Sequence, residues 1–121
     1  MMGRFQEELL ERVERFADRV LDVARAVEQA GAPRRIVDQL IGSGTSVGAN
    51  TFEADEAMSR PDFCRILAII LKELNETRFW LRLISRRGWV PPSRLESLEH
   101  EARELKLVFG AVLSRTRAND R

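Results

Sequence analysis

The chain has 121 residues, of which 44% are hydrophobic and 32% charged, and its 20 Lys plus Arg against 19 Asp plus Glu leave a net charge of +1. This length fits one domain around one core, over residues 1–121. The near-balanced charge is unlike the basic excess of a general nucleic-acid coater, although a local basic stripe is compatible with it.

Features of membrane and exported proteins are missing from the sequence. Cys64 is the only cysteine, which excludes an internal disulfide, and the N-terminal stretch MMGRFQEELLERVERF is too charged for a signal peptide. Lys72 and Glu73 interrupt the longest apolar run, far short of the roughly 18 apolar residues of a membrane span. We expect a cytoplasmic protein that does not enter a membrane.

The first half of the chain predicts two helices. Apolar residues recur at alternating spacings of four and three along residues 4–30, which is typical of one helix with a single apolar face. Gly31 suits the end of that helix, and Pro33 suits the first turn of the next one. The second helix is expected over residues 33–56.

The second half predicts two more helices. Ser59, with an acidic residue three positions later, is a suitable N-cap for a third helix over residues 60–87. Ser93 and Glu96 repeat this pattern before a fourth helix over residues 93–117. Four helices with short connections predict an all-α fold, an antiparallel up-down-up-down four-helix bundle.

The glycine-rich stretch IGSGTSVGAN, residues 41–50, lies inside the second predicted helix. It matches neither a dinucleotide fingerprint nor a P-loop, because the spacing is G-x-G-x-x-x-G and no lysine follows. Gly44 and Gly48 lie one helical turn apart, where small residues let two helix backbones approach closely. Each interior glycine costs up to about 1 kcal/mol of helix propensity, so we expect close packing in return.

The third predicted helix has more apolar surface than one bundle core needs. Its first face combines Phe63, Leu67, Ile70, Leu74 and Leu81. An adjoining face combines Ile69, Glu73, Glu76, Trp80 and Leu83. A large aromatic residue among aliphatic side chains suits a subunit interface better than a solvated surface, so we infer a homo-oligomer.

Carboxylates near that second face have two interpretations. Glu53, Glu73 and Glu76 could hold a divalent ion, but no Glu-x-x-His pair of the di-iron bundle type is present. The preferred interpretation is an oligomer interface or a buried polar network that includes Asn50 and Trp80. The polar groups of Ser43, Thr45, Ser46 and Asn50 would then satisfy the carboxylates from the facing helix or from a neighbouring subunit.

No catalytic group is predicted elsewhere. His100 lies among charged residues without further metal ligands, and Cys64 has no obvious base partner. We therefore predict no catalytic residue, no metal site and no cofactor.

Arginines follow one another at intervals of four on another face of the third helix, at Arg78, Arg82 and Arg86, with Arg87 beside the last. One interpretation is a solvated face whose cations interact favourably with the helix C-terminus. The other is a line of phosphate contacts, repeated by the symmetry of an oligomer.

The stretch from Gln39 to Ile84 carries a family resemblance. Its specific features are SGTSVGAN at residues 43–50, Glu53, the restart from Ser59 to Phe63, and LKELNETRFWL with Lys72, Glu73, Glu76 and Trp80. In these features the chain resembles the small bacterial four-helix-bundle proteins encoded by intervening sequences of 23S ribosomal RNA genes. One departure is the run Thr51, Phe52, Glu53, Ala54, where family members usually have Ile-Ala-Glu-Gly.

The resemblance implies properties that the residues alone do not. The family is similar in fold to the accessory variability determinant of diversity-generating retroelements, a basic pentamer that binds nucleic acid and a reverse transcriptase. The resemblance therefore implies a homopentamer with RNA or DNA as a partner. It implies no established reaction.

Three functions follow from these observations. The first is a non-enzymatic homo-oligomeric scaffold that serves as a nucleic-acid-binding or ribonucleoprotein accessory factor. The second is a protein-protein adaptor without a nucleic-acid ligand, since near-neutral charge also suits protein contacts. The most remote is an enzyme with a carboxylate-bound metal.

Overall fold

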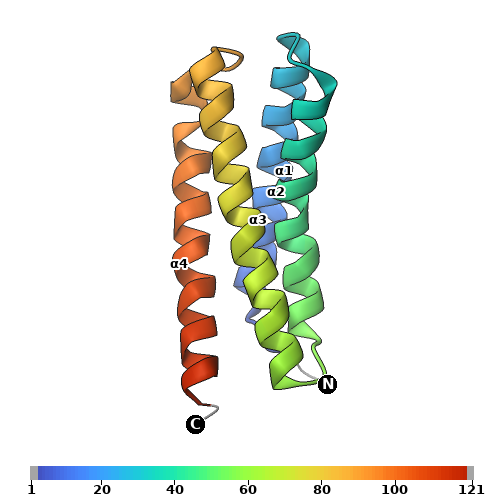
Figure 1. Cartoon of the computed structure of the whole chain (residues 1–121), viewed down its shortest axis with the longest axis vertical. Coiled ribbons are helices and arrows are strands. Elements are labelled where there is room, and N and C mark those ends of the chain that lie inside the picture. The colour runs from blue at the N-terminus through green and yellow to red at the C-terminus, as the bar shows by residue number, and fades with distance from the viewer. Residues whose placement is uncertain (1–2, 120–121) are drawn as a thin grey trace.

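The computed structural model describes residues 3–119, which form an antiparallel up-down-up-down bundle of long helices (Figure 1). The helices are α1 (Glu7–Gln29), α2 (Arg34–Asp55), α3 (Arg60–Arg87) and α4 (Glu96–Ala118). A short 3-10 helix, η1 (Pro92–Arg94), precedes α4. Both ends of the chain lie at the end of the bundle where α2 turns into α3. The expected all-α four-helix bundle is confirmed.

Local chemistry explains where α1 ends and where α3 begins and ends. The Ser59 hydroxyl accepts a hydrogen bond from the Asp62 backbone N–H at 3.2 Å, which confirms the expected N-cap of α3. Gly31 follows α1 with φ of +86°, and Gly88 ends α3 with φ of +74°, conformations that favour glycine.

Two helix starts differ from the expectation. α4 begins at Glu96 with Leu95 as its cap, so the predicted Ser93 cap is wrong; Ser93 lies inside η1, which the preceding prolines favour. α1 begins at Glu7 and not at residue 4. Just before α1, the Phe5 backbone N–H donates to the Asp55 carboxylate at 2.7 Å, and this bond ties the first described residues to the end of α2.

Gly44 and Gly48 of α2, here called the glycine strip, pack against α1. A Cβ atom on Gly44 would lie 2.5 Å from Cγ1 of Val20, closer than real side chains approach. A Cβ on Gly48 would lie 3.5 Å from the backbone oxygen of Val13. The absence of side chains at these two buried positions therefore lets α1 and α2 approach, as the sequence indicated.

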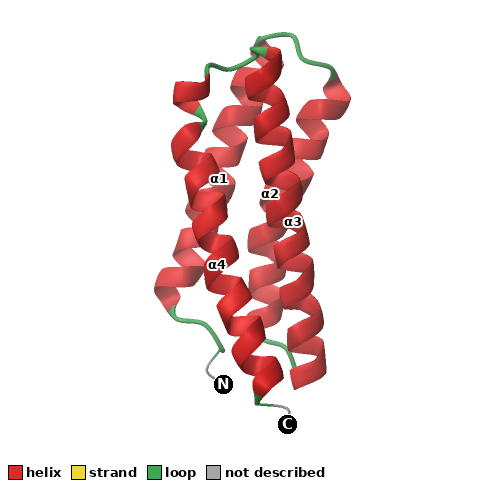
Figure 2. Cartoon of the chain, turned by 60° about the vertical axis from the view of Figure 1, so that its left-hand side comes forward, coloured by secondary structure: helices red, strands yellow, loops and turns green. Residues whose placement is uncertain are grey.

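The core runs the length of the bundle between the helices, and Phe16, Leu40, Leu74 and Phe109 are among its fully buried side chains. α4 runs along the front of the bundle in Figure 2, and polar contacts also join it to α1. Within residues 3–119, no helix is long and apolar enough to cross a membrane.

Candidate functional site

α3 presents its different faces to different surroundings. Its first apolar face is buried in the core, as expected: Leu67, Ile70, Leu74 and Leu81 are fully buried, and Phe63 nearly so. The side chains of the second face, including Trp80, are half-buried. What remains is the outer face, which points away from the core and carries arginines.

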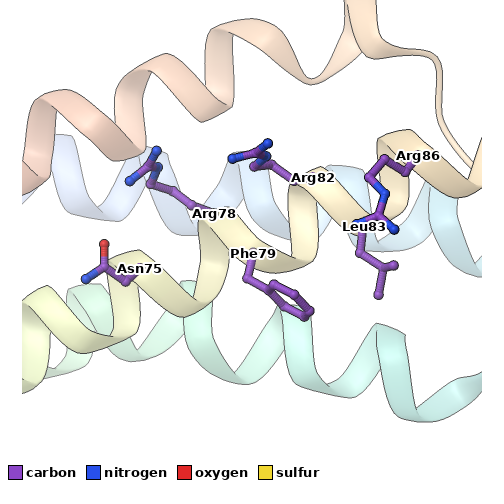
Figure 3. A pocket seen from close by; sticks show the side chains of 6 residues that line it. All are labelled: Asn75, Arg78, Phe79, Arg82, Leu83 and Arg86. Atoms are coloured by element: carbon purple, nitrogen blue, oxygen red, sulfur yellow. The ribbon is translucent and has the colours of Figure 1, made fainter.

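The outer face of α3 is formed by six side chains on successive turns: Asn75, Arg78, Phe79, Arg82, Leu83 and Arg86, of which Leu83 also borders the second face. They line an open hollow of about 280 Å³. Figure 3 shows Arg78 and Arg82 extending to one side of the helix and Phe79 and Leu83 to the other. Cations and apolar groups therefore flank the same stretch of helix.

Three of the four predicted arginines share this hollow, and the fourth does not. Arg87 lies instead over the ring of Trp89, with its guanidinium carbon 5.8 Å from the ring centroid. This cation–π contact places Arg87 beside the loop that leads to η1.

The arginines of the outer face lack partners among the described residues. Among residues 3–119, no hydrogen bond or ion pair joins Arg78, Arg82 or Arg86 to another side chain or to the backbone. The Nε atom of Arg78 is buried and still has no hydrogen-bond partner in that part of the chain. A buried donor without a partner is costly, so this atom is expected to gain one when the surface is occupied.

Trp80 of the second face contacts both a carboxylate of that face and an aromatic ring of the outer face. Its Nε1–H donates to the Glu76 carboxylate at 3.3 Å, and its ring meets that of Phe79 edge-to-face at a centroid distance of 5.0 Å. Partial burial raises the pKa of Glu73, and the neighbouring Glu76 carboxylate raises it further, while Lys72 lowers it. This face thus combines apolar surface with the Glu73 carboxylate, whose charged form is disfavoured by its surroundings.

The expected polar network between α2 and the glutamates is not formed within the described chain. Asn50 donates to the Ser46 carbonyl at 2.9 Å and Thr45 to the Ile41 carbonyl at 2.7 Å, while Glu53 is exposed. Short polar side chains in a helix readily bond to the carbonyl one turn earlier. Partners for the glutamates from a neighbouring subunit stay a prediction.

The one hydrogen bond between hydroxyl groups of α2 and α3 is buried in the described bundle. The Thr77 hydroxyl lies 3.0 Å from the Ser43 hydroxyl, and it also bonds to the Glu73 carbonyl at 2.8 Å. This pair fixes α3 against α2 and leaves the Glu73 and Glu76 side chains out of the contact.

The remaining chemically active side chains do not form a reactive group. His100 is exposed and lies 3.3 Å from the Glu104 carboxylate, and Cys64 is partly buried. Within residues 3–119, no three His, Cys, Asp or Glu side chains come together as metal ligands would.

Sequence reasoning missed two features of the surface. Asn75, Phe79 and Leu83 share the hollow with the arginines, and their spacing of three and four residues from Arg78, Arg82 and Arg86 was the available signal. A larger hollow of about 420 Å³ lies between the start of α1 and the second half of α4, and no sequence pattern pointed to it.

Comparison with known proteins agrees with the fold. The family model of the 23S rRNA-intervening sequence protein matches residues 6–110. A crystal structure described as a protein of unknown function from the S23 ribosomal protein family, from Bacteroides thetaiotaomicron VPI-5482, is 32% identical with a TM-score of 0.82. That match covers 86% of this chain and 96% of the other. No curated protein gives a significant match.

The matched region includes α1, α2, α3 and most of α4, and therefore both the glycine strip and the outer face of α3. With this much of the fold shared, the chain belongs to the 23S rRNA-intervening sequence protein family.

Proposed function

We propose that this protein is a non-enzymatic, homo-oligomeric scaffold that binds nucleic acid through the outer face of α3. The observation that carries the proposal is the set of three arginines, Arg78, Arg82 and Arg86, around one open hollow without partners in the described chain. Guanidinium groups bind phosphate oxygens through paired hydrogen bonds, and phosphate contacts supply most of the affinity for a nucleic-acid backbone.

The chain's charge pattern supports a local contact. With a net charge of +1, the whole molecule has little electrostatic attraction for a polyanion. Arginines already neutralised inside the bundle add nothing to binding, whereas those of the outer face keep their full charge for a ligand.

Assembly is the second part of the proposal. The half-buried face around Trp80, with the raised pKa of Glu73, would lose more solvent and gain polar partners when a second subunit covers it. The family resemblance makes a pentamer the expected state. Repetition around a ring would multiply the outer arginine faces and raise affinity for a long strand through multivalency.

The direct test measures binding of the wild type and two charge-reversal variants to labelled structured RNA, single strands and duplex DNA at low salt. Arg82→Glu with Arg86→Glu should weaken binding at least about tenfold, because cations at the phosphates become anions. Arg25→Glu with Arg35→Glu is the matched control, since both residues are exposed and lie on other helices. Equal loss in both double variants would show that only total charge matters and would overturn the assigned site.

A protein-protein adaptor is the second candidate. Met58 and Leu107 are large apolar side chains that are 88% and 70% exposed, which favours a protein contact at those positions. Failure of the wild type to bind any of the three nucleic acids would favour this candidate. Affinity capture that recovers only nucleic acid would count against it.

A further inference from the structure

The outer face of α3 carries an aromatic ring beside its arginines. Phe79 is 55% exposed although phenylalanine is usually buried, and it lines the same hollow as Arg78 and Arg82. From this arrangement we infer that the nucleic acid bound here is single-stranded, with a base stacked on Phe79 and phosphates at the arginines. The inference rests on the proposed function and names its ligand class.

The direction of the side chains separates the two kinds of contact. In Figure 3 the guanidinium groups of Arg78 and Arg82 lie on one side of α3, and the ring of Phe79 and the side chain of Leu83 lie on the other. A strand that follows the helix can place its phosphates on the first side and its bases on the second. A duplex cannot do this, because its bases are already stacked and paired inside it.

The spacing of the arginines suits a strand that runs along the helix. Arg78, Arg82 and Arg86 succeed one another every four residues, which is about 6 Å along a helix axis at 1.5 Å per residue. This rise is comparable with the separation of neighbouring phosphates in an extended strand. The guanidinium groups of Arg78 and Arg82, which lie on one side of α3 in Figure 3, can therefore meet successive phosphates without a change in the helix.

Phe79 is also held in place. The edge-to-face contact with Trp80 has an interplanar angle of 73°, and Trp80 is itself anchored by the hydrogen bond to Glu76. A ring supported in this way loses little conformational freedom when a base stacks on it.

The experiment compares labelled 12-nucleotide single strands of RNA and DNA with duplexes of the same sequences by fluorescence anisotropy. Single strands should bind about tenfold or more tightly than duplexes. Phe79→Ala should weaken single-strand binding about fivefold or more, as is usual for loss of a stacking ring, and leave duplex binding unchanged. These expectations apply to whichever sugar binds more tightly.

Three further variants identify the cause of any change. Phe79→Trp keeps an aromatic face and should retain single-strand binding, whereas Phe79→Leu keeps apolar area alone and should behave like Phe79→Ala. Leu107→Ala removes another exposed apolar side chain, on α4, and should have no effect. Because Phe79 is largely exposed, each of its variants should keep the helical circular dichroism of the wild type.

Equal binding of the wild type and Phe79→Ala to single strands would overturn the stacking inference, as would duplex binding as tight as single-strand binding. Both outcomes leave the arginine contact intact, since Arg82→Glu with Arg86→Glu would still weaken binding. Absence of binding to any nucleic acid overturns the proposed function itself. The two failures are therefore distinguishable.

Discussion

α1 and the outer face of α3 both carry arginines, but their surroundings differ. Arg12 of α1 makes two hydrogen bonds of 2.7 Å to the Glu101 carboxylate of α4, and Arg19 reaches the Ser97 hydroxyl at 2.8 Å. The three arginines of the outer face have no such partner within residues 3–119. Arg25 of α1 makes no hydrogen bond or ion pair there either, so the proposed surface differs in that three such cations line one hollow together with Phe79.

On another side, α1 packs closely against Gly44 and Gly48 of α2. Gly44→Leu should have the largest effect, because even a Cβ at this position would lie 2.5 Å from Cγ1 of Val20. The free energy of unfolding should fall by about 3 kcal/mol or more, measured by urea denaturation. Gly42→Ala is the control: nothing lies within 4 Å of its Cβ, so it should gain up to about 1 kcal/mol. A Gly44→Leu protein as stable as the wild type would disprove the close approach.

The second face of α3, around Trp80, is the proposed contact with another subunit. Trp80→Glu should raise the dissociation constant of the oligomer by about 100-fold or more, because a buried aromatic at an interface centre contributes strongly to binding. Light scattering at micromolar concentration measures the change, and Leu107→Glu on α4 is the control. A monomeric wild type would contradict the assigned interface.

The ion pair between α1 and α4 predicts a stability that depends on pH. The hydrogen bond from Arg12 holds the pKa of Glu101 below its ordinary value of 4.5, and partial burial opposes this effect. A lowered pKa in the folded state stabilises the fold above the unfolded pKa, and this contribution disappears as pH falls through the folded pKa. Glu101→Gln should cost about 0.5–1 kcal/mol at pH 7, since the pair is partly exposed, and much less at pH 3. Equal costs at both pH values would contradict the ion pair.

The raised pKa of Glu73, on α3, predicts a pH dependence of stability opposite to that of Glu101. Its pKa is raised in the folded protein, so the folded state binds the proton more tightly and loses stability as pH rises from the unfolded pKa through the folded one. Glu73→Gln should therefore stabilise the protein at pH 7 by about a few tenths of a kcal/mol, with no gain at pH 3. Urea unfolding at both pH values measures this smallest effect, and destabilisation at pH 7 would show that the carboxylate has a favourable partner.

Much of the fold could be predicted, because the helical spacing of apolar residues, the glycine that ends a helix and the Ser59 cap are signals within short stretches of sequence. The start of α4 was predicted wrongly, because Pro92 to Arg94 form a 3-10 helix and Ser93 lies inside it instead of capping α4. Contacts between distant residues were not predictable in the same way. Arg12 and Glu101 are 89 positions apart, and only the packing of α1 against α4 sets their register.

The candidate site was predicted in part, for the same physical reason. Helical spacing places Arg78, Arg82 and Arg86 on one face, but it does not show that they lack partners. The exposure of Phe79 also depends on how α3 sits in the bundle, since another orientation would have turned that ring inward.

The salt dependence of binding tests the phosphate contacts most directly. The logarithm of the association constant for a single strand, plotted against the logarithm of the salt concentration, should fall on a steep line for the wild type. Arg82→Gln with Arg86→Gln should make that line shallower by about 1.4, because each lost phosphate contact removes about 0.7 from the slope. Parallel lines for the two proteins would contradict phosphate binding at the outer face of α3.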